Sequence, residues 1–336
     1  GMGLAWLTRD PRNAEGWRRH AIAPDLLLRP LLLIGGWHDP HLLGVLDLAR
    51  QSQAAGGQPA LRIGAWSHLD WQGGLDALQL AFFRRHLHRD AAEGCPEPGS
   101  VSLQCPRSAR WSVPTRLSSG VEEPGQGPPA GAFHWRLASD GLAIIRADEG
   151  RLVPFEQQTS SHGLTLVHDP WRPVPSRGGH LGPEPGLCER ADLDRRADVA
   201  CFQTAPMGAP IAWIGRPLLR IRMAADQPGC DLWATLSVVR RDGSVLQCCS
   251  GVRRLLGEEA LTPEPRLVEL QPCWIRLEAG ERLRLSLAAS AWPAIAVNPG
   301  DGSLPCGGSE LGHRVISLDL DLATSHLWLD PLIVAN

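Results

Sequence analysis

Two short apolar runs, each ended by glycine and joined through one helical segment, most strongly limit how this chain can fold. Residues 30–34 are apolar on both faces and are followed by Gly35 and Gly36, which is typical of a buried parallel strand. Residues 42–54 carry apolar side chains at helical spacing. Residues 60–63 repeat the strand pattern, and residues 75–87 have a second amphipathic helical pattern. This part of the chain therefore predicts one βαβ unit with a trailing helix.

From about residue 93 onward, proline and glycine become frequent, and short alternating runs replace the helical pattern. Alternation of apolar and polar residues is typical of half-buried strands, and turn signals such as Asp242-Gly243 separate the runs. Many such strands predict an antiparallel β-sandwich or jelly roll. We therefore expect a mostly β chain with a small α/β part, divided into domains at residues 1–92 and 93–336, with a linker or surface loop within residues 121–131. The alternating runs are residues 220–224, 232–239, 283–287 and 315–322.

The charge of the chain argues against two classes of partner. Its 336 residues carry 33 basic and 36 acidic side chains, a net charge of −3, so we expect no basic surface for nucleic acid or for an anionic membrane. No apolar run approaches the roughly 20 residues that a membrane span needs. The first residues, GMGLAW, lack the apolar stretch of a signal peptide, so we expect a cytoplasmic protein.

The spacing of cysteine and histidine predicts neither a metal nor a cofactor. The nine cysteines include no C-x-x-C pair and are expected to be free thiols in a reducing compartment. His86 and His88 are two residues apart with no cysteine pair at ligand spacing near them, so a zinc site is not expected. The 13 tryptophans leave two interpretations open, since they serve either as anchors of the core or as sugar-stacking groups on the sandwich.

Polar side chains follow both predicted parallel strands, at the edge where ligands and catalytic groups collect in α/β sheets. The motif GGWHD ends in Asp39, and the motif GAWSH ends in His68. A carboxylate beside an imidazole is the orienting acid and general base of a Ser-His-Asp triad, and α/β-hydrolases place the acid before the base. Asp39 and His68 are therefore the candidate catalytic residues. The competing interpretation is that Asp39 caps a helix and His68 is packed against a tryptophan.

The run PLLLIGGWHDPHLLGVL and the later run PALRIGAWSH resemble the end of the hydrolase domain in the X-prolyl dipeptidyl-peptidase and cocaine esterase (CocE/NonD) family. In that family the acid ends a GGWxD-type motif and the base ends a GPWSH-type motif. The resemblance therefore implies that Asp39 is the acid and His68 is the base. Ala65 stands where the family has the proline of the second motif.

The resemblance continues downstream to roughly residue 331. HDPWRPVPSRGG at residues 168–179 is similar to the family's DPxxPVPxxGG segment, and RADV at residues 196–199 begins a segment similar to RxDVLxFxT. The resemblance implies a truncated α/β-hydrolase remnant at residues 1–92 and a galactose-binding-like jelly roll at residues 93–336. It also implies the activity of a serine esterase or dipeptidyl-peptidase, which hydrolyses esters or amides. GER at residues 280–282 departs from a GHR-type segment and implies no function.

One departure from the family decides the expected activity. The family's nucleophilic serine lies in a G-x-S-x-G elbow before the acid, and no such motif occurs in these 336 residues. The glycines around Ser309 have one residue too many between them, and Ser67 lies directly beside His68 without an elbow. Without a nucleophile the covalent route is lost, so we expect this chain alone to be inactive. The alternatives are a non-catalytic binding or interaction module based on the jelly roll, and the product of a split gene.

The first predicted strand has no preceding neighbour in this chain. The backbone groups along residues 31–34 would be left unpaired, and a two-stranded parallel sheet is too small to stand alone. We therefore expect this edge to be buried against the jelly roll, against a second copy, or against a partner chain that supplies the front half of the hydrolase domain. A two-fold dimer is the simplest closed arrangement.

Overall fold

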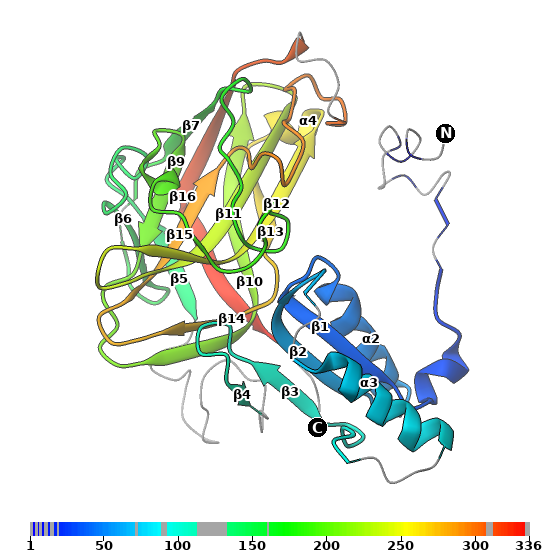
Figure 1. Cartoon of the computed structure of the whole chain (residues 1–336). Helices are drawn as coiled ribbons and strands as arrows, with labels where there is room; N and C mark the ends of the chain where they lie inside the picture. The colour runs from blue at the N-terminus through cyan, green and yellow to red at the C-terminus, as the bar shows by residue number, and fades with distance from the viewer. Residues whose placement is uncertain are drawn as a thin grey trace.

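The computed structural model describes residues 20–70, 73–88, 93–112, 133–159, 161–306 and 312–332, together with a few positions before residue 20. The expected linker at residues 121–131 lies outside the described residues. The chain forms a small α/β part and a larger β-sandwich that lies against it (Figure 1). No described helix is long and apolar enough to cross a membrane.

The α/β part begins with a short 3-10 helix, η1 (Pro24–Leu28), and continues as the expected strand–helix–strand unit. Strand β1 (Leu32–His38) pairs in parallel with strand β2 (Ala60–Ser67). The helix between them, α2 (Leu42–Ala54), has the bounds that the apolar spacing predicts. It is followed by α3 (Leu75–Phe83) and a π-helical turn, η2 (Arg84–His88). In Figure 1, α3 passes in front of the sheet and α2 lies behind it.

The two strands extend further than the sequence pattern predicts. Gly35 and Gly36 lie inside β1 instead of ending it, because each allows a neighbour to come close. A Cβ at Gly35 would lie 3.1 Å from the side chain of Leu42 in α2, and a Cβ at Gly36 would collide with the backbone of Trp66. The strands therefore run on to the residues directly before Asp39 and His68.

The first sheet also continues past the expected domain boundary at residue 92. Strands β3 (Val101–Gln104) and β4 (Trp111–Ser112) complete a four-stranded sheet in the order β1-β2-β3-β4, with β3 parallel to β2. The buried side chain of Trp37 donates a hydrogen bond of 2.8 Å to the carbonyl oxygen of Gln104. Strands β3 and β4, which follow residue 92, thus belong to the sheet of the α/β part and not to that of the sandwich.

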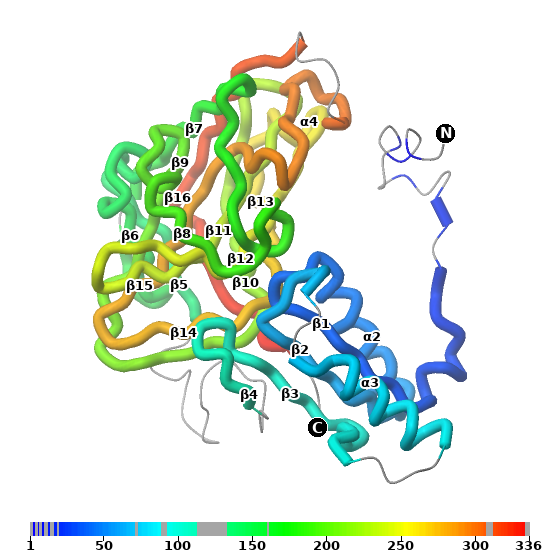
Figure 2. Tube along the Cα trace, viewed as in Figure 1, coloured from blue at the N-terminus to red at the C-terminus, as the bar shows by residue number. Residues whose placement is uncertain are grey.

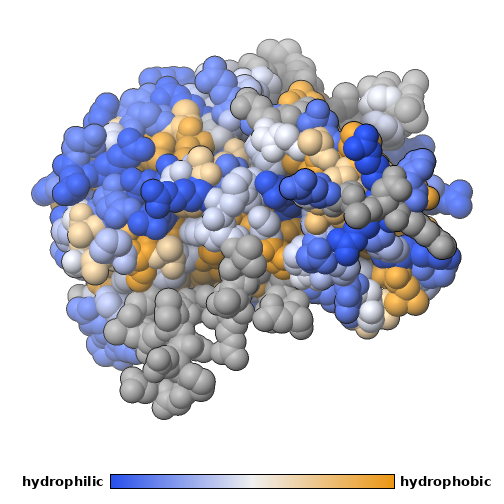
Figure 3. Space-filling model, turned by 60° about the horizontal axis from the view of Figure 1, so that its bottom comes forward, coloured by the Kyte–Doolittle hydropathy of each residue, from blue (hydrophilic) through white to orange (hydrophobic). Residues whose placement is uncertain are grey.

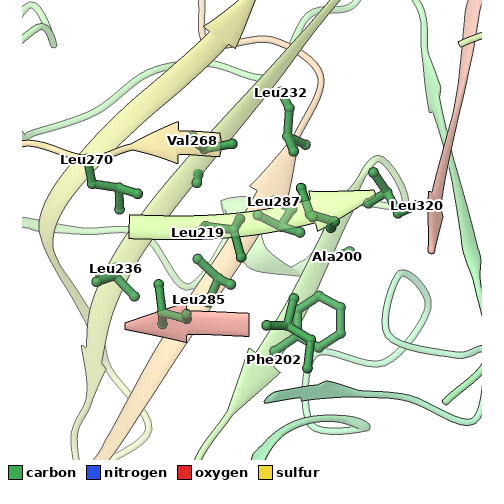
Figure 4. Close-up of a cluster of buried hydrophobic side chains, with 14 of the residues drawn as sticks. Ala200, Phe202, Leu219, Leu232, Leu236, Val268, Leu270, Leu285, Leu287 and Leu320 are labelled. Atoms are coloured by element: carbon green, nitrogen blue, oxygen red, sulfur yellow. The ribbon is translucent and has the colours of Figure 1, made fainter. Parts of the chain in front are cut away.

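The sandwich consists of a second, 12-stranded sheet that folds over on itself, in the order β13-β10-β16-β5-β6-β9-β15-β11-β12-β8, with β14 beside β10 and β7 beside β16. Figure 4 shows Leu219, Phe202, Leu285 and Leu320 meeting in the core between its two layers. The strands are β5 (His134–Ala138), β6 (Gly150–Pro154), β7 (Leu164–His168), β8 (Cys188–Glu189), β9 (Val199–Gln203), β10 (Ile211–Ala225), β11 (Gly229–Val239), β12 (Val245–Leu256), β13 (Glu264–Glu269), β14 (Cys273–Leu277), β15 (Arg282–Ala288) and β16 (Ile316–Pro331), and the short helices are η3 (Leu193–Arg195) and α4 (Glu258–Leu261).

The alternation expected at residues 220–224 and 315–322 is confirmed, because buried and more exposed side chains alternate along β10 and β16. The half-buried pattern expected for residues 232–239 and 283–287 is wrong. Nearly all of β11 and β15 is buried, because segments distant in sequence cover their outer faces. Asp231 of β11 accepts hydrogen bonds from Arg254 and from Asn298, which lies in the loop before β16.

The outer face of β15 is covered in the same way by a buried polar cluster. The carboxylate of Asp194 in η3 accepts hydrogen bonds from Arg190, Arg284 and the hydroxyl of Ser286, at 2.9 to 3.1 Å. Two cations and a hydroxyl thus satisfy the fully buried carboxylate, as a buried charge requires. The cluster explains why the polar positions of this strand are not exposed to solvent.

The two parts of the molecule are joined by apolar packing and by polar contacts. Trp274, Ile214 and Leu332 of the sandwich side pack against the apolar core of the α/β part. Arg107, in the segment between β3 and β4 that Figure 2 shows reaching toward β14, forms a two-pronged ion pair with Glu281 at 2.5 and 3.0 Å. Burial alone would raise the pKa of Glu281, but the hydrogen bond from Arg107 lowers it. The sequence implied no function for Glu281, and the structure gives it a role in joining the two parts of the molecule.

Candidate functional site

The parallel register of β1 and β2 brings the two candidate catalytic residues together. His38 is paired with Ser67 at the ends of the two strands, so Asp39 and His68 leave the sheet side by side. This is the carboxyl edge at which α/β sheets collect functional groups. The adjacency of Asp39 and His68 that the sequence predicts is confirmed.

The loop that carries Asp39 is held by four hydrogen bonds. The backbone N–H of Asp39 donates to the carbonyl oxygen of Gly36 at 3.1 Å, and Leu42 N–H donates to the Asp39 carbonyl at 3.1 Å. The Asp39 carboxylate accepts the backbone N–H of His41 at 2.8 Å. The buried side chain of Gln271, from the sandwich, donates to the Asp39 carbonyl at 2.7 Å. These contacts fix the position of the carboxylate before anything binds.

The imidazole of His68 presents one ring nitrogen to this carboxylate. Nδ1 lies 3.3 Å from Oδ1 and 3.4 Å from Oδ2 of Asp39, which is long for a hydrogen bond and within the range seen before a substrate binds. The side chain of Asp39 is 18% exposed and that of His68 is 55% exposed. A carboxylate beside Nδ1 favours a proton on that nitrogen, which leaves Nε2 free to accept one.

A cavity of about 890 Å³ runs along β1 and ends at Asp39 and His68. Strand β1 is the terminal strand of its sheet, so among the described residues its outer edge has no paired neighbour. The side walls of the cavity come from α2, with Val45 and Leu48, and from α3, with Phe82 and Phe83. Figure 3 shows hydrophobic surface between hydrophilic groups on the side of the molecule where the α/β part lies. The cavity is thus a largely apolar groove with one polar end.

Two buried histidines lie close to the site but are not part of the pair. Burial, together with a smaller effect of the nearby His180, lowers the pKa of His38 to about 4. Burial likewise lowers the pKa of His180 to about 4. Both rings are therefore neutral near pH 7. His38 is the last residue of β1 and directly precedes Asp39. Protonation of His38 or His180 would therefore place a buried charge next to the loop that carries the acid.

Two residues at the site were missed by sequence reasoning. The ring of His41 lies beside that of His68, with 4.8 Å between their centroids. Its place two residues after Asp39 is visible in the sequence, but no spacing in the sequence links it to His68. Gln271 lies 232 residues away from Asp39, and no sequence signal connects the two.

The structure thus joins a mostly parallel sheet, with Asp39 and His68 directly after two of its neighbouring strands, to a larger β-sandwich. Residues 119–326 match the family described as the X-Pro dipeptidyl-peptidase C-terminal non-catalytic domain, and the chain belongs to this family. It is also 27% identical over 285 residues to the cocaine esterase of Rhodococcus sp. (strain MB1 Bresler), an alignment that covers 77% of this chain and 47% of that protein.

Solved structures give the same fold. An aminopeptidase from a marine sediment archaeon, Thaumarchaeota archaeon, matches with a TM-score of 0.66 at 15% identity, and the match covers 90% of this chain and 54% of the aminopeptidase. An α-amino acid ester hydrolase matches with a TM-score of 0.66 at 16% identity, and the match covers 91% of this chain and 57% of that protein. A CocE/NonD family hydrolase from Staphylococcus aureus matches with a TM-score of 0.56 at 13% identity, and the match covers 89% of this chain and 54% of that protein. The chain spans about half the length of the relatives it matches.

Proposed function

We propose that Asp39 and His68 are the orienting acid and general base of a serine hydrolase that acts on esters or amides, with the nucleophile supplied from outside these 336 residues. The observation that carries this proposal is the approach of His68 Nδ1 to the Asp39 carboxylate at 3.3 Å, beside the end of an apolar groove. The base takes the proton of an attacking hydroxyl at Nε2, and Asp39 stabilises the imidazolium that results.

The groove along β1 supports the same proposal. Its floor is the edge of β1, which has no paired neighbour among the described residues, and helices lie on both sides, so the groove has the environment that a further strand requires. A segment that pairs with β1 would carry its own strand end toward the edge at which Asp39 and His68 lie. A nucleophile at the end of such a segment would therefore lie near His68. We infer that this chain alone is not a serine hydrolase.

The experiment has two arms. A fluorophosphonate should not label the purified chain, and the chain should show no His68-dependent hydrolysis of p-nitrophenyl acetate. In a chimera that joins the front half of the Rhodococcus cocaine esterase to this chain, hydrolysis should appear and should fall by roughly 10³-fold or more in His68→Ala. His162→Ala, at an exposed sandwich histidine, serves as the control. A folded, active chimera that is indifferent to His68→Ala would contradict the proposal.

The family description favours a second candidate, a non-catalytic interaction module in which the sandwich is the working part. We assign the sandwich to the jelly-roll type on the resemblance to that family. Such a module needs neither Asp39 nor His68. The module would still bind or stabilise its partner when Asp39→Asn and His68→Ala are combined, whereas the hydrolase would lose its activity in that double variant.

A further inference from the structure

The loops after β1 and β2 bring together three side chains that share one further property. One potential ligand atom each from Asp39, His41 and His68 lies within 4.8 Å of the other two. In the part of the chain that the structure describes, this is the one group of three such side chains at that spacing. His41 takes no part in the proposed proton transfer, so its presence calls for a separate explanation.

The donor set has a definite preference among metal ions. Two imidazole nitrogens and one carboxylate oxygen suit divalent transition metals such as Zn²⁺, whereas Ca²⁺ and Mg²⁺ prefer oxygen ligands. Bond lengths of about 2.0 to 2.2 Å place the donors of a tetrahedral zinc ion roughly 3.3 to 3.5 Å apart. His41 and His68 are exposed, so their side chains have room to rotate toward a shared ion.

The carboxylate is already oriented by its neighbours. It accepts the backbone N–H of His41 at 2.8 Å, and its own backbone carbonyl is held by Gln271 at 2.7 Å. Hydrogen bonds that fix a ligand in this way are typical of metal sites and raise their affinity. The three side chains also lie at the open end of the groove, where an ion can enter from solvent.

We propose that Asp39, His41 and His68 form a binding site for a divalent transition-metal ion of the Zn²⁺ class, with the fourth position left to water. The ion would occupy the same carboxylate and imidazole that the proposed function uses for proton transfer. Bound metal and proton transfer by His68 therefore exclude each other. The inference itself needs only the three side chains and does not rest on the proposed function.

Calorimetric titration of the 336-residue chain with Zn²⁺ tests the proposal. We expect one site of micromolar or tighter affinity, weakened at least tenfold in His41→Ala and in His41→Gln, and unchanged in His162→Ala. The titration is run in a Cys306→Ser background, because Cys306 is an exposed thiol that would compete for zinc. His41 is exposed and not part of the acid–base pair, so its variants are expected to fold and circular dichroism verifies this.

Two results of the titration would overturn the proposal. The first is the absence of zinc binding at micromolar concentrations. The second is equal affinity in the parent chain and both His41 variants, which would place the ion elsewhere. X-ray absorption at the zinc edge gives an independent readout, with nitrogen and oxygen donors expected and sulfur donors contradicting the site. Neither result bears on the hydrolase proposal, since the Asp39–His68 pair functions there without His41.

Discussion

The side-chain amide of Gln271 donates a hydrogen bond of 2.7 Å to the backbone carbonyl oxygen of Asp39, and so ties the sandwich to the loop that carries the proposed acid. Gln271 is itself buried and fixed, since its backbone N–H donates to the carbonyl oxygen of Ser250 at 2.9 Å. The sandwich is therefore part of the support of the site. Its contact with the α/β part does more than cover an apolar surface.

Removing this contact should weaken the fold at the junction. Gln271→Ala is expected to lower the free energy of unfolding by about 1 to 2 kcal/mol, because a buried hydrogen bond is lost. Gln51→Ala, at an exposed position of α2 where the side chain also hydrogen-bonds to a carboxylate, should cost less than about 0.5 kcal/mol. Urea denaturation followed by fluorescence measures both. Equal effects of the two substitutions would mean that the buried contact contributes no more than an exposed hydrogen bond.

Acid should destabilise the protein through the buried His38. Its pKa is about 4 in the folded chain, below the ordinary value near 6.5. Between these values the unfolded chain binds more protons than the folded chain, so the free energy of unfolding falls as the pH is lowered through that window. The full difference corresponds to a loss on the order of 3 kcal/mol.

The variant His38→Gln isolates this contribution, since glutamine does not titrate. Its unfolding free energy should depend less on pH between 7 and 4 than that of the parent chain. His162→Gln, at an exposed histidine, should leave the slope unchanged. A slope that is the same in all three proteins would show that His38 is protonated as easily in the folded state as in the unfolded one.

The open edge of β1 should make the isolated chain self-associate. We expect a two-fold dimer by light scattering at micromolar concentration. The edge of β1, beside an apolar groove, has no partner strand in the part of the chain that the structure describes, and it is buried most simply against its own copy. Phe83→Asp, at a groove residue that is 53% exposed, should give monomers, whereas Ile145→Asp on the sandwich should not. A monomeric parent chain with exchange-protected amides at residues 31–34 would contradict this prediction.

The small α/β part was predictable because its signals are local. The apolar spacing of α2 determines its bounds without help from the rest of the fold. The strand ends were not predictable from the same pattern, since Gly36 is required by the close approach of the Trp66 backbone, Gly35 lies close to Leu42, and neither marks the end of β1. A pair of glycines occurs both at the end of a strand and within a strand that a neighbour approaches closely. Only the packing of the folded chain distinguishes the two cases.

The limits in the sandwich have the same origin. The alternation of β10 was readable because one face of that strand is more exposed, whereas β11 is covered on its outer face by residues such as Asn298 from a distant loop. At the site, Asp39 and His68 could be predicted because parallel strands end at one edge. Gln271 could not, because its contact depends on how the two parts meet.

The tautomer of His68 tests the central claim, that Asp39 orients His68 as a base, most directly. Nitrogen chemical shifts of the purified chain at pH 8 should show the proton of His68 on Nδ1, with Nε2 as acceptor, because Nδ1 faces the Asp39 carboxylate. In Asp39→Asn this preference should be lost, while in His162→Ala it should remain. A proton on Nε2 in the parent chain, or the same tautomer with and without the carboxylate, would contradict the account.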